Sequence, residues 1–107
     1  MRILFVCSEN RLRSPTAAAV FAEYDGVDAI SAGTNSDCDT PVSGDLIEWA
    51  DVVLVMEASH KRKVSKKFQP LLKNKKVSVL NIPDDFEFMD PELVQILMNR
   101  IPLYVNL

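Results

Sequence analysis

Residues 3–6 of this chain, Ile-Leu-Phe-Val, are apolar at every position. A strand with one face in water alternates apolar and polar side chains, whereas a strand of a parallel sheet is buried on both faces and can be apolar throughout. Short apolar, β-branched runs recur at residues 27–31, 51–56 and 77–81, where we expect three further strands. The sequence therefore predicts a mainly parallel sheet of four strands.

The segments between these runs have helical patterns. Ser14 is a good helix N-cap, and Pro15 stands at the position in the first turn where proline is favoured. The apolar stripe of this first helix is formed by Ala17, Val20, Phe21 and Tyr24. Further helices are expected at 45–49, 59–73 and 90–100, the last opened by Asp90.

Strands that alternate with helices build βαβ units with right-handed crossovers. The length of 107 residues and the hydrophobic fraction of 48% are enough for one core. We therefore predict a single domain over residues 1–107. Its fold class is α/β: a three-layer α/β/α sandwich around a four-stranded parallel sheet.

The net charge of −3 argues against general nucleic-acid binding, although the charge is unevenly distributed. Eight of the twelve basic residues lie within residues 61–76, where apolar side chains recur at helical spacing between the lysines. This pattern is typical of the solvated face of an amphipathic helix. The alternative is a surface that meets an acidic or phosphorylated partner.

Cysteine and histidine are scarce in this sequence. Cys7 and Cys38 are the two cysteines, and His60, the single histidine, has no neighbours that would complete a metal site, so we expect no metal and a solvated or capping histidine. The N-terminal apolar run is too short for a membrane span and lacks the cleavage site of a secretory signal. A cytoplasmic protein with free thiols and no membrane association is therefore expected.

The most informative stretch for chemistry is residues 7–16, Cys-Ser-Glu-Asn-Arg-Leu-Arg-Ser-Pro-Thr, between the first strand and the first helix. A loop of this length can curl so that its backbone N–H groups and those of the helix N-terminus converge on an anion. The same positive field favours the thiolate of Cys7, which is the nucleophilic form. Arg13 can bind two phosphate oxygens at once. These features predict a phosphate-binding loop with a nucleophilic cysteine.

The stretch resembles the signature of the low-molecular-weight protein tyrosine phosphatases, in which a cysteine, five residues, an arginine and Ser-Pro follow a hydrophobic strand. Three more segments are similar to that family in the same order. Residues 31–34 resemble its Ser-Ala-Gly-Thr, residues 51–57 resemble its third strand, and residues 82–86, Ile-Pro-Asp-Asp-Phe, resemble the segment with its general acid. The resemblance extends from residue 2 to about residue 97.

The resemblance implies a phosphatase that needs no cofactor and acts on a phosphotyrosine-containing protein or a small aryl phosphate. Cys7 would form a cysteinyl-phosphate, Arg13 would bind the phosphoryl oxygens, and Asp84 would be the general acid, with Asp85 as the alternative. Ser14 would stabilise the thiolate, and Asn10, Ser14 and Ser31 would brace the loop. The phosphate would be bound by Ser8, Glu9, Asn10, Arg11, Leu12, Arg13 and Ser14.

The sequence departs from the family pattern in two regions. The chain is short between residues 34 and 51, where the family usually has a helix, an aromatic recognition loop and often a bracing histidine, so a shallower cleft is expected. In the loop, Glu9 stands where many members have glycine, and Arg11-Leu12 replaces an apolar residue and a cysteine. Glu9 is expected to weaken phosphate binding unless it points to solvent or Arg11 offsets its charge.

Other functions stay open at this stage. A non-catalytic phosphate or phosphoprotein-binding module is the main alternative. Thiol-dependent arsenate reduction would have only Cys38 as a relay, and a sugar-phosphotransfer component would need neither Arg13 nor the aspartate. Aromatic side chains could line the cleft, although a core role is the default for each; the candidates are Trp49, Phe86 and Phe88. The oligomeric state is not indicated.

Overall fold

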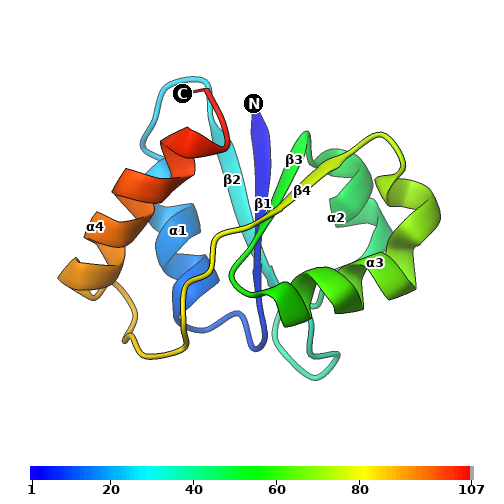
Figure 1. The fold of residues 1–107 in the computed structure, drawn as a ribbon, viewed down its shortest axis with the longest axis horizontal. Coiled ribbons are helices and arrows are strands. Elements are labelled where there is room, and N and C mark those ends of the chain that lie inside the picture. Colours follow the sequence, from blue (N-terminus) through cyan, green and yellow to red (C-terminus); the bar gives the residue numbers. More distant parts are fainter. Residues whose placement is uncertain (107) are drawn as a thin grey trace.

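The structure is a computed structural model that describes residues 1–106, and a four-stranded parallel sheet forms its centre (Figure 1). The strands are β1 (Arg2–Cys7), β2 (Asp28–Gly33), β3 (Val52–Val55) and β4 (Lys76–Val79), in the order β2-β1-β3-β4. β1 is central: Phe5 lies opposite Ser31 of β2 on one side and Leu54 of β3 on the other. The predicted parallel sheet is confirmed.

Two helices cover each face of the sheet (Figure 1). Helices α1 (Arg13–Phe21) and α4 (Pro91–Arg100) lie on one face, and α2 (Gly44–Trp49) and α3 (Ala58–Leu72) lie on the other. A 3-10 turn, η1 (Ile101–Leu103), follows α4. The predicted three-layer sandwich is confirmed, although Leu107 of the predicted domain lies outside the described residues. None of the described helices has the length and hydrophobicity needed to cross a membrane.

The continuous apolar run of β1 contributes to both halves of the core. Successive side chains of a strand point to opposite faces. Ile3, Phe5 and Cys7 therefore pack toward α1 and α4, while Leu4 and Val6 pack toward α2 and α3. All five are at most 3% exposed. Cys7 thus ends β1 at the carboxyl edge of the sheet, on the face that α1 covers.

The N-terminus of α1 differs from the prediction. Leu12 precedes the helix and no side chain caps it. The prediction that Ser14 is the N-cap is wrong, because Ser14 lies inside the first turn and its buried hydroxyl contacts Cys7 instead. The uncapped end leaves backbone N–H groups free at the loop. At α4, by contrast, Asp90 accepts a hydrogen bond from the backbone N–H of Glu92, which confirms the predicted cap.

Helix α3 carries the basic segment. Glu57 is its N-cap and forms a capping box with His60 three residues later. The helix is kinked at Phe68, whose φ and ψ of −123° and 22° are not helical, two residues before Pro70. Its basic side chains are exposed, as predicted for a solvated face; these are Lys61, Arg62, Lys63, Lys66 and Lys67.

Candidate active site

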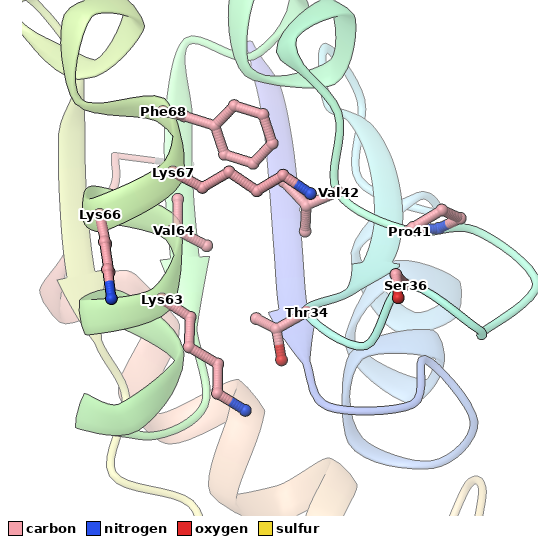
Figure 2. A pocket seen from close by; sticks show the side chains of 9 residues that line it. All are labelled: Thr34, Ser36, Pro41, Val42, Lys63, Val64, Lys66, Lys67 and Phe68. Atoms are coloured by element: carbon pink, nitrogen blue, oxygen red, sulfur yellow. The ribbon is translucent and has the colours of Figure 1, made fainter.

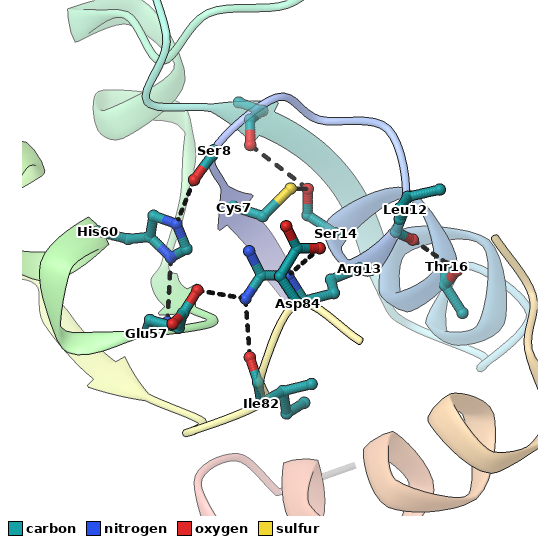
Figure 3. Close-up of polar contacts among 11 residues, drawn as sticks. Cys7, Ser8, Leu12, Arg13, Ser14, Thr16, Glu57, His60, Ile82 and Asp84 are labelled. Carbon is teal, nitrogen blue, oxygen red and sulfur yellow. Dashed lines mark hydrogen bonds and ion pairs between the residues drawn. The ribbon is translucent and has the colours of Figure 1, made fainter. Parts of the chain in front are cut away.

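The loop at residues 8–12 joins Cys7, the last residue of β1, to Arg13, the first residue of α1 (Figure 3). Asn10 has a φ of +56°, a left-handed conformation that turns the chain back on itself. Within the described residues, no backbone carbonyl accepts a hydrogen bond from the N–H groups of residues 8–12. These five successive donors are therefore not used by backbone carbonyls, and binding of an anion by them stays a prediction.

The sulfur of Cys7 contacts Ser14. Its Sγ lies 2.9 Å from Ser14 Oγ, which is also 3.2 Å from Asn10 Oδ1 and 3.4 Å from the carbonyl oxygen of Ala32. A hydroxyl has one hydrogen, so Ser14 can donate to only one of these acceptors at a time. A thiolate would be the strongest of the three because hydrogen bonds to charged acceptors are the stronger ones. Ser14 is therefore well placed to stabilise a thiolate at Cys7.

Arg13 is 2% exposed, and contacts on one side fix its guanidinium. Nη1 donates to Glu57 Oε2 at 2.6 Å and to the carbonyl oxygen of Ile82 at 2.8 Å (Figure 3). Both hydrogens of Nη1 are therefore used, and the edge of the guanidinium formed by Nε and Nη2 remains available to a ligand. This edge has the geometry that binds two oxygens of a phosphate.

A cavity of about 230 Å³ contains most of the predicted site residues. The carboxylate of Asp84 lies at this cavity, with Oδ1 3.7 Å from Nε of Arg13, whereas Asp85 does not line it. The side chain of Asp84 is 64% exposed, so water reaches it freely. The cavity is lined by Cys7, Ser8, Glu9, Arg11, Leu12, Arg13 and Asp84.

His60 supports the loop from α3. Its Nδ1 accepts a hydrogen bond from the backbone N–H of Glu57 at 3.0 Å, so Nε2 carries the proton and donates to Ser8 Oγ at 2.9 Å. Burial, with the nearby charge of Arg13, lowers the pKa of His60 to about 4. His60 caps helix α3, which was one of its two predicted roles. It is not solvated, because it is only 1% exposed. Because Ser8 accepts from His60, its own O–H is free to donate into the cavity.

The side chains of Glu9 and Arg11 differ in position. Glu9 Oε1 accepts a hydrogen bond from Asn35 Nδ2, which holds the carboxylate at the outer edge of the loop. Arg11 is exposed and lines the same cavity. The two residues therefore contribute opposite charges to the cavity rim, as expected if Arg11 offsets Glu9.

Gly33 permits the loop to pass close to β2. A Cβ at this position would lie 2.5 Å from the carbonyl oxygen of Ser8, 2.7 Å from Sγ of Cys38 and 3.2 Å from the backbone nitrogen of Asn10. In folded proteins, a Cβ essentially never lies within 3.0 Å of a heavy atom from a residue that is not its neighbour in the chain. Glycine at this point of the Ser-Ala-Gly-Thr segment is therefore a steric requirement of the loop.

Several predicted residues are not brought to the cavity. Asn10 Oδ1 accepts a hydrogen bond from Ser14 within the loop, and Ser31 lies in the middle of β2, opposite Phe5 and two residues before the edge. Bracing of the loop by Ser31 stays a prediction. Trp49 and Phe86 pack against the two halves of the core, and Phe88 is exposed outside the cavity.

The sequence analysis gave Glu57 no role at the site and His60 only a solvated or capping one. Both follow the carboxyl end of β3, which ends at the same edge of the sheet as β1. This position after a predicted strand is the signal that could have placed them near the site. Within residues 1–106, no group of three or more histidine, cysteine or acidic side chains could hold a metal ion.

No family model matches the sequence, and no curated protein matches it either. Among solved structures, the YwlE arginine phosphatase from Geobacillus stearothermophilus has a TM-score of 0.72 and 25% identity, over 91% of this chain and 88% of that one. A C7S mutant of a YwlE arginine phosphatase, with a phosphorylated active-site serine, has a TM-score of 0.72 and 26% identity over 91% of each chain. SP-PTP from Streptococcus pyogenes, a low-molecular-weight protein tyrosine phosphatase, has a TM-score of 0.78 and 15% identity over 98% of this chain and 93% of that one.

The fold shared with these proteins is that of a class of phosphatases built on a parallel α/β sheet. Within the class, it is the fold of the low-molecular-weight protein tyrosine phosphatases. The family resemblance in the sequence is therefore confirmed.

Proposed function

We propose that the protein is a cysteine-dependent phosphatase that hydrolyses phosphotyrosine or small aryl phosphate esters. The observation that carries this proposal is one cavity of about 230 Å³ that holds the sulfur of Cys7, the guanidinium of Arg13 and the carboxylate of Asp84. A nucleophile, a phosphate ligand and a proton donor are the three groups that phosphate ester cleavage by this route needs. The likeness to a YwlE arginine phosphatase with a phosphorylated active-site serine supports a reaction in which a side chain of the site accepts the phosphoryl group.

The proposed reaction has two steps. In the first, the Cys7 thiolate attacks phosphorus, the bond from phosphorus to the leaving oxygen breaks, and Asp84 gives that oxygen its proton. In the second, the Asp84 carboxylate takes a proton from water, the resulting hydroxide attacks phosphorus, and the thiolate leaves with inorganic phosphate as the product. Arg13 and the loop N–H groups hold the phosphoryl oxygens in both steps, and Ser14 stabilises the thiolate.

The test is hydrolysis of p-nitrophenyl phosphate across pH 5 to 8, with reductant present. We expect Cys7→Ser to abolish turnover, because an alcohol at position 7 is a poor nucleophile. Asp84→Asn should lower kcat by roughly a hundredfold, which is typical for loss of a general acid. Asp85→Asn is the matched control and should retain activity, because Asp85 lies outside the cavity. Equal losses in the Asp84 and Asp85 variants would contradict the assignment of Asp84.

A second substrate class, phosphoarginine, is favoured by the likeness to YwlE arginine phosphatases at 25–27% identity. The carboxylates of Glu9 and Asp84 at the cavity rim would suit a cationic guanidinium. Comparing kcat/KM for a phosphoarginine peptide and a phosphotyrosine peptide of the same sequence distinguishes the two. A native protein that binds inorganic phosphate but turns over neither peptide would instead be the non-catalytic phosphate-binding module.

A further inference from the structure

A groove of about 440 Å³ lies between α3 and the segment that follows β2 (Figure 2). Its apolar surface is formed by Val42, Val64 and Phe68, and three lysines of α3 line it together with the polar side chains of Thr34 and Ser36. The groove therefore lies at the segment after β2, which the sequence analysis expects to be shorter than in the family it resembles.

The groove continues into the candidate active site. A third hollow, of about 600 Å³, shares Lys63 and Lys67 with the groove. The same hollow shares Ser8 and Glu9 with the phosphate cavity. A bound chain could therefore run from the phosphate cavity along α3 without leaving the surface.

The charge in this groove is positive and unpaired. Lys63 and Lys67 are four residues apart, so they lie on the same face of α3, and Figure 2 shows their side chains extending into the groove. Within the described residues, neither lysine nor Lys66 forms an ion pair with a carboxylate. The one acidic side chain at the connecting hollow, Glu9, is bound to Asn35.

We propose that the groove binds acidic residues that flank the phosphorylated residue of a protein substrate; this rests on the proposed phosphatase function. The geometry fits a peptide. With a rise of 1.5 Å per residue, Lys63 and Lys67 lie about 4.5 and 10.5 Å beyond His60 along α3, and His60 contacts Ser8 at the phosphate cavity. An extended peptide advances about 3.3 Å per residue, so the lysines match side chains one to three positions from the phosphorylated residue.

The test compares kcat/KM for two phosphotyrosine peptides that differ only in having three glutamates or three glutamines on each side of the phosphotyrosine. We expect the native protein to prefer the glutamate peptide roughly tenfold at low salt, and less in 1 M NaCl. Lys63→Glu/Lys67→Glu should abolish the preference. Lys61→Glu/Arg62→Glu, which changes the net charge equally at exposed residues outside the groove, should retain it.

Equal kcat/KM for the two peptides would overturn the inference, as would equal loss of preference in the two double variants, because the effect would then be one of general charge. If neither peptide is turned over, the proposed hydrolysis of phosphotyrosine fails. Fluorescence anisotropy with the same labelled peptides then decides the inference. Tighter binding of the glutamate peptide that depends on Lys63 and Lys67 supports the groove, and equal binding overturns it.

Discussion

Nη1 of Arg13 and Oε2 of Glu57 lie 2.6 Å apart, although 44 residues separate the two in the sequence. The bond connects the first turn of α1 to the N-cap of α3, across the sheet edge at which β1 and β3 end. It leaves the opposite edge of the guanidinium facing the cavity. The hydrogen bond from Arg13 also lowers the pKa of Glu57, so that the carboxylate keeps its charge to a lower pH than an ordinary glutamate. Glu57 thereby orients the arginine and balances its buried charge.

The first prediction concerns this pair. Glu57→Gln leaves the buried Arg13 without its countercharge, and we expect the free energy of unfolding in urea at pH 7 to fall by about 1–2 kcal/mol. This is less than the 3–5 kcal/mol for breaking a fully buried pair, because the Glu57 side chain is 42% exposed. Glu23→Gln, at an exposed position after α1, is the control and should change stability by less than about 0.5 kcal/mol.

The lowered pKa of Glu57 also determines how the stability difference between the native protein and Glu57→Gln changes with pH. A carboxyl group whose pKa is lowered by folding stabilises the fold above its unfolded pKa, and that stabilisation is lost as the pH falls through the folded value. The native protein and Glu57→Gln should therefore converge in stability as the pH falls below the ordinary glutamate pKa of 4.5. A difference that is unchanged between pH 7 and pH 3 would show that the charge of Glu57 is not its cause.

The second prediction concerns His60, whose pKa is lowered to about 4 by burial. Between the ordinary value of 6.5 and about 4, the unfolded chain binds a proton that the folded chain does not. Stability should therefore fall as the pH drops through this window, by up to about 3 kcal/mol from this residue alone. Protonated Nδ1 can no longer accept from Glu57, so the capping box would be lost as well.

His60→Gln is the informative variant, because glutamine is a usual residue at this position of a capping box and does not titrate. Urea unfolding at pH 4.5, 5.5, 6.5 and 7.5 should give a nearly flat stability profile for the variant over the window in which the native protein loses stability. Parallel profiles for the two proteins would mean that some other group titrates there.

The third prediction concerns Ser8, whose hydroxyl is held by His60 and retains a free hydrogen at the cavity. Ser8→Ala removes one hydrogen bond to a charged oxygen, worth about 1.5 kcal/mol. Inorganic phosphate should therefore inhibit, or bind, roughly tenfold more weakly. Ser65→Ala on α3, at a residue that does not line the cavity, should leave phosphate affinity unchanged. Unchanged affinity in Ser8→Ala would indicate that its hydrogen points elsewhere.

Much of the fold follows from short-range patterns in the sequence. The apolar run of β1 predicts burial on both faces, and Asp90-Pro91 predicts the start of α4 because the capping side chain and the proline act within a few residues. Ser14 shows the limit of such reasoning. Its local preference is to cap a helix, but the contact with Cys7 seven residues earlier decides its position. A tertiary contact overrides a local preference in this case.

In the candidate site, too, local patterns predict some residues and tertiary contacts determine the others. Cys7, Arg13 and Asp84 could be proposed from motifs, because each stands in a segment of recognisable order, and the structure brings all three to one cavity. The roles of Glu57 and His60 depend on contacts with Arg13 and Ser8 that are 44 and 52 residues distant. Such pairings depend on the order of strands in the sheet, and no local pattern encodes them.

The last prediction concerns Gly33. Its added Cβ in Gly33→Ala would meet a backbone oxygen of the loop and the sulfur of Cys38, and the backbone cannot move aside as a flexible side chain can. The loop at residues 8–12 should shift, and a displacement of about 1 Å at a reactive centre can lower turnover by roughly a hundredfold. We expect loss of this size in p-nitrophenyl phosphate hydrolysis, with weaker phosphate binding by the folded variant.

Two further variants identify the cause of that loss. Gly44→Ala, at the start of α2, meets only the end of the Leu71 side chain at 3.1 Å and should retain activity. Gly33→Ala/Cys38→Ala relieves the contact with sulfur but not the one with the Ser8 carbonyl, so activity should stay low. Recovery of full activity in the double variant would assign the effect to Cys38 and remove the argument that the loop backbone itself requires glycine at position 33.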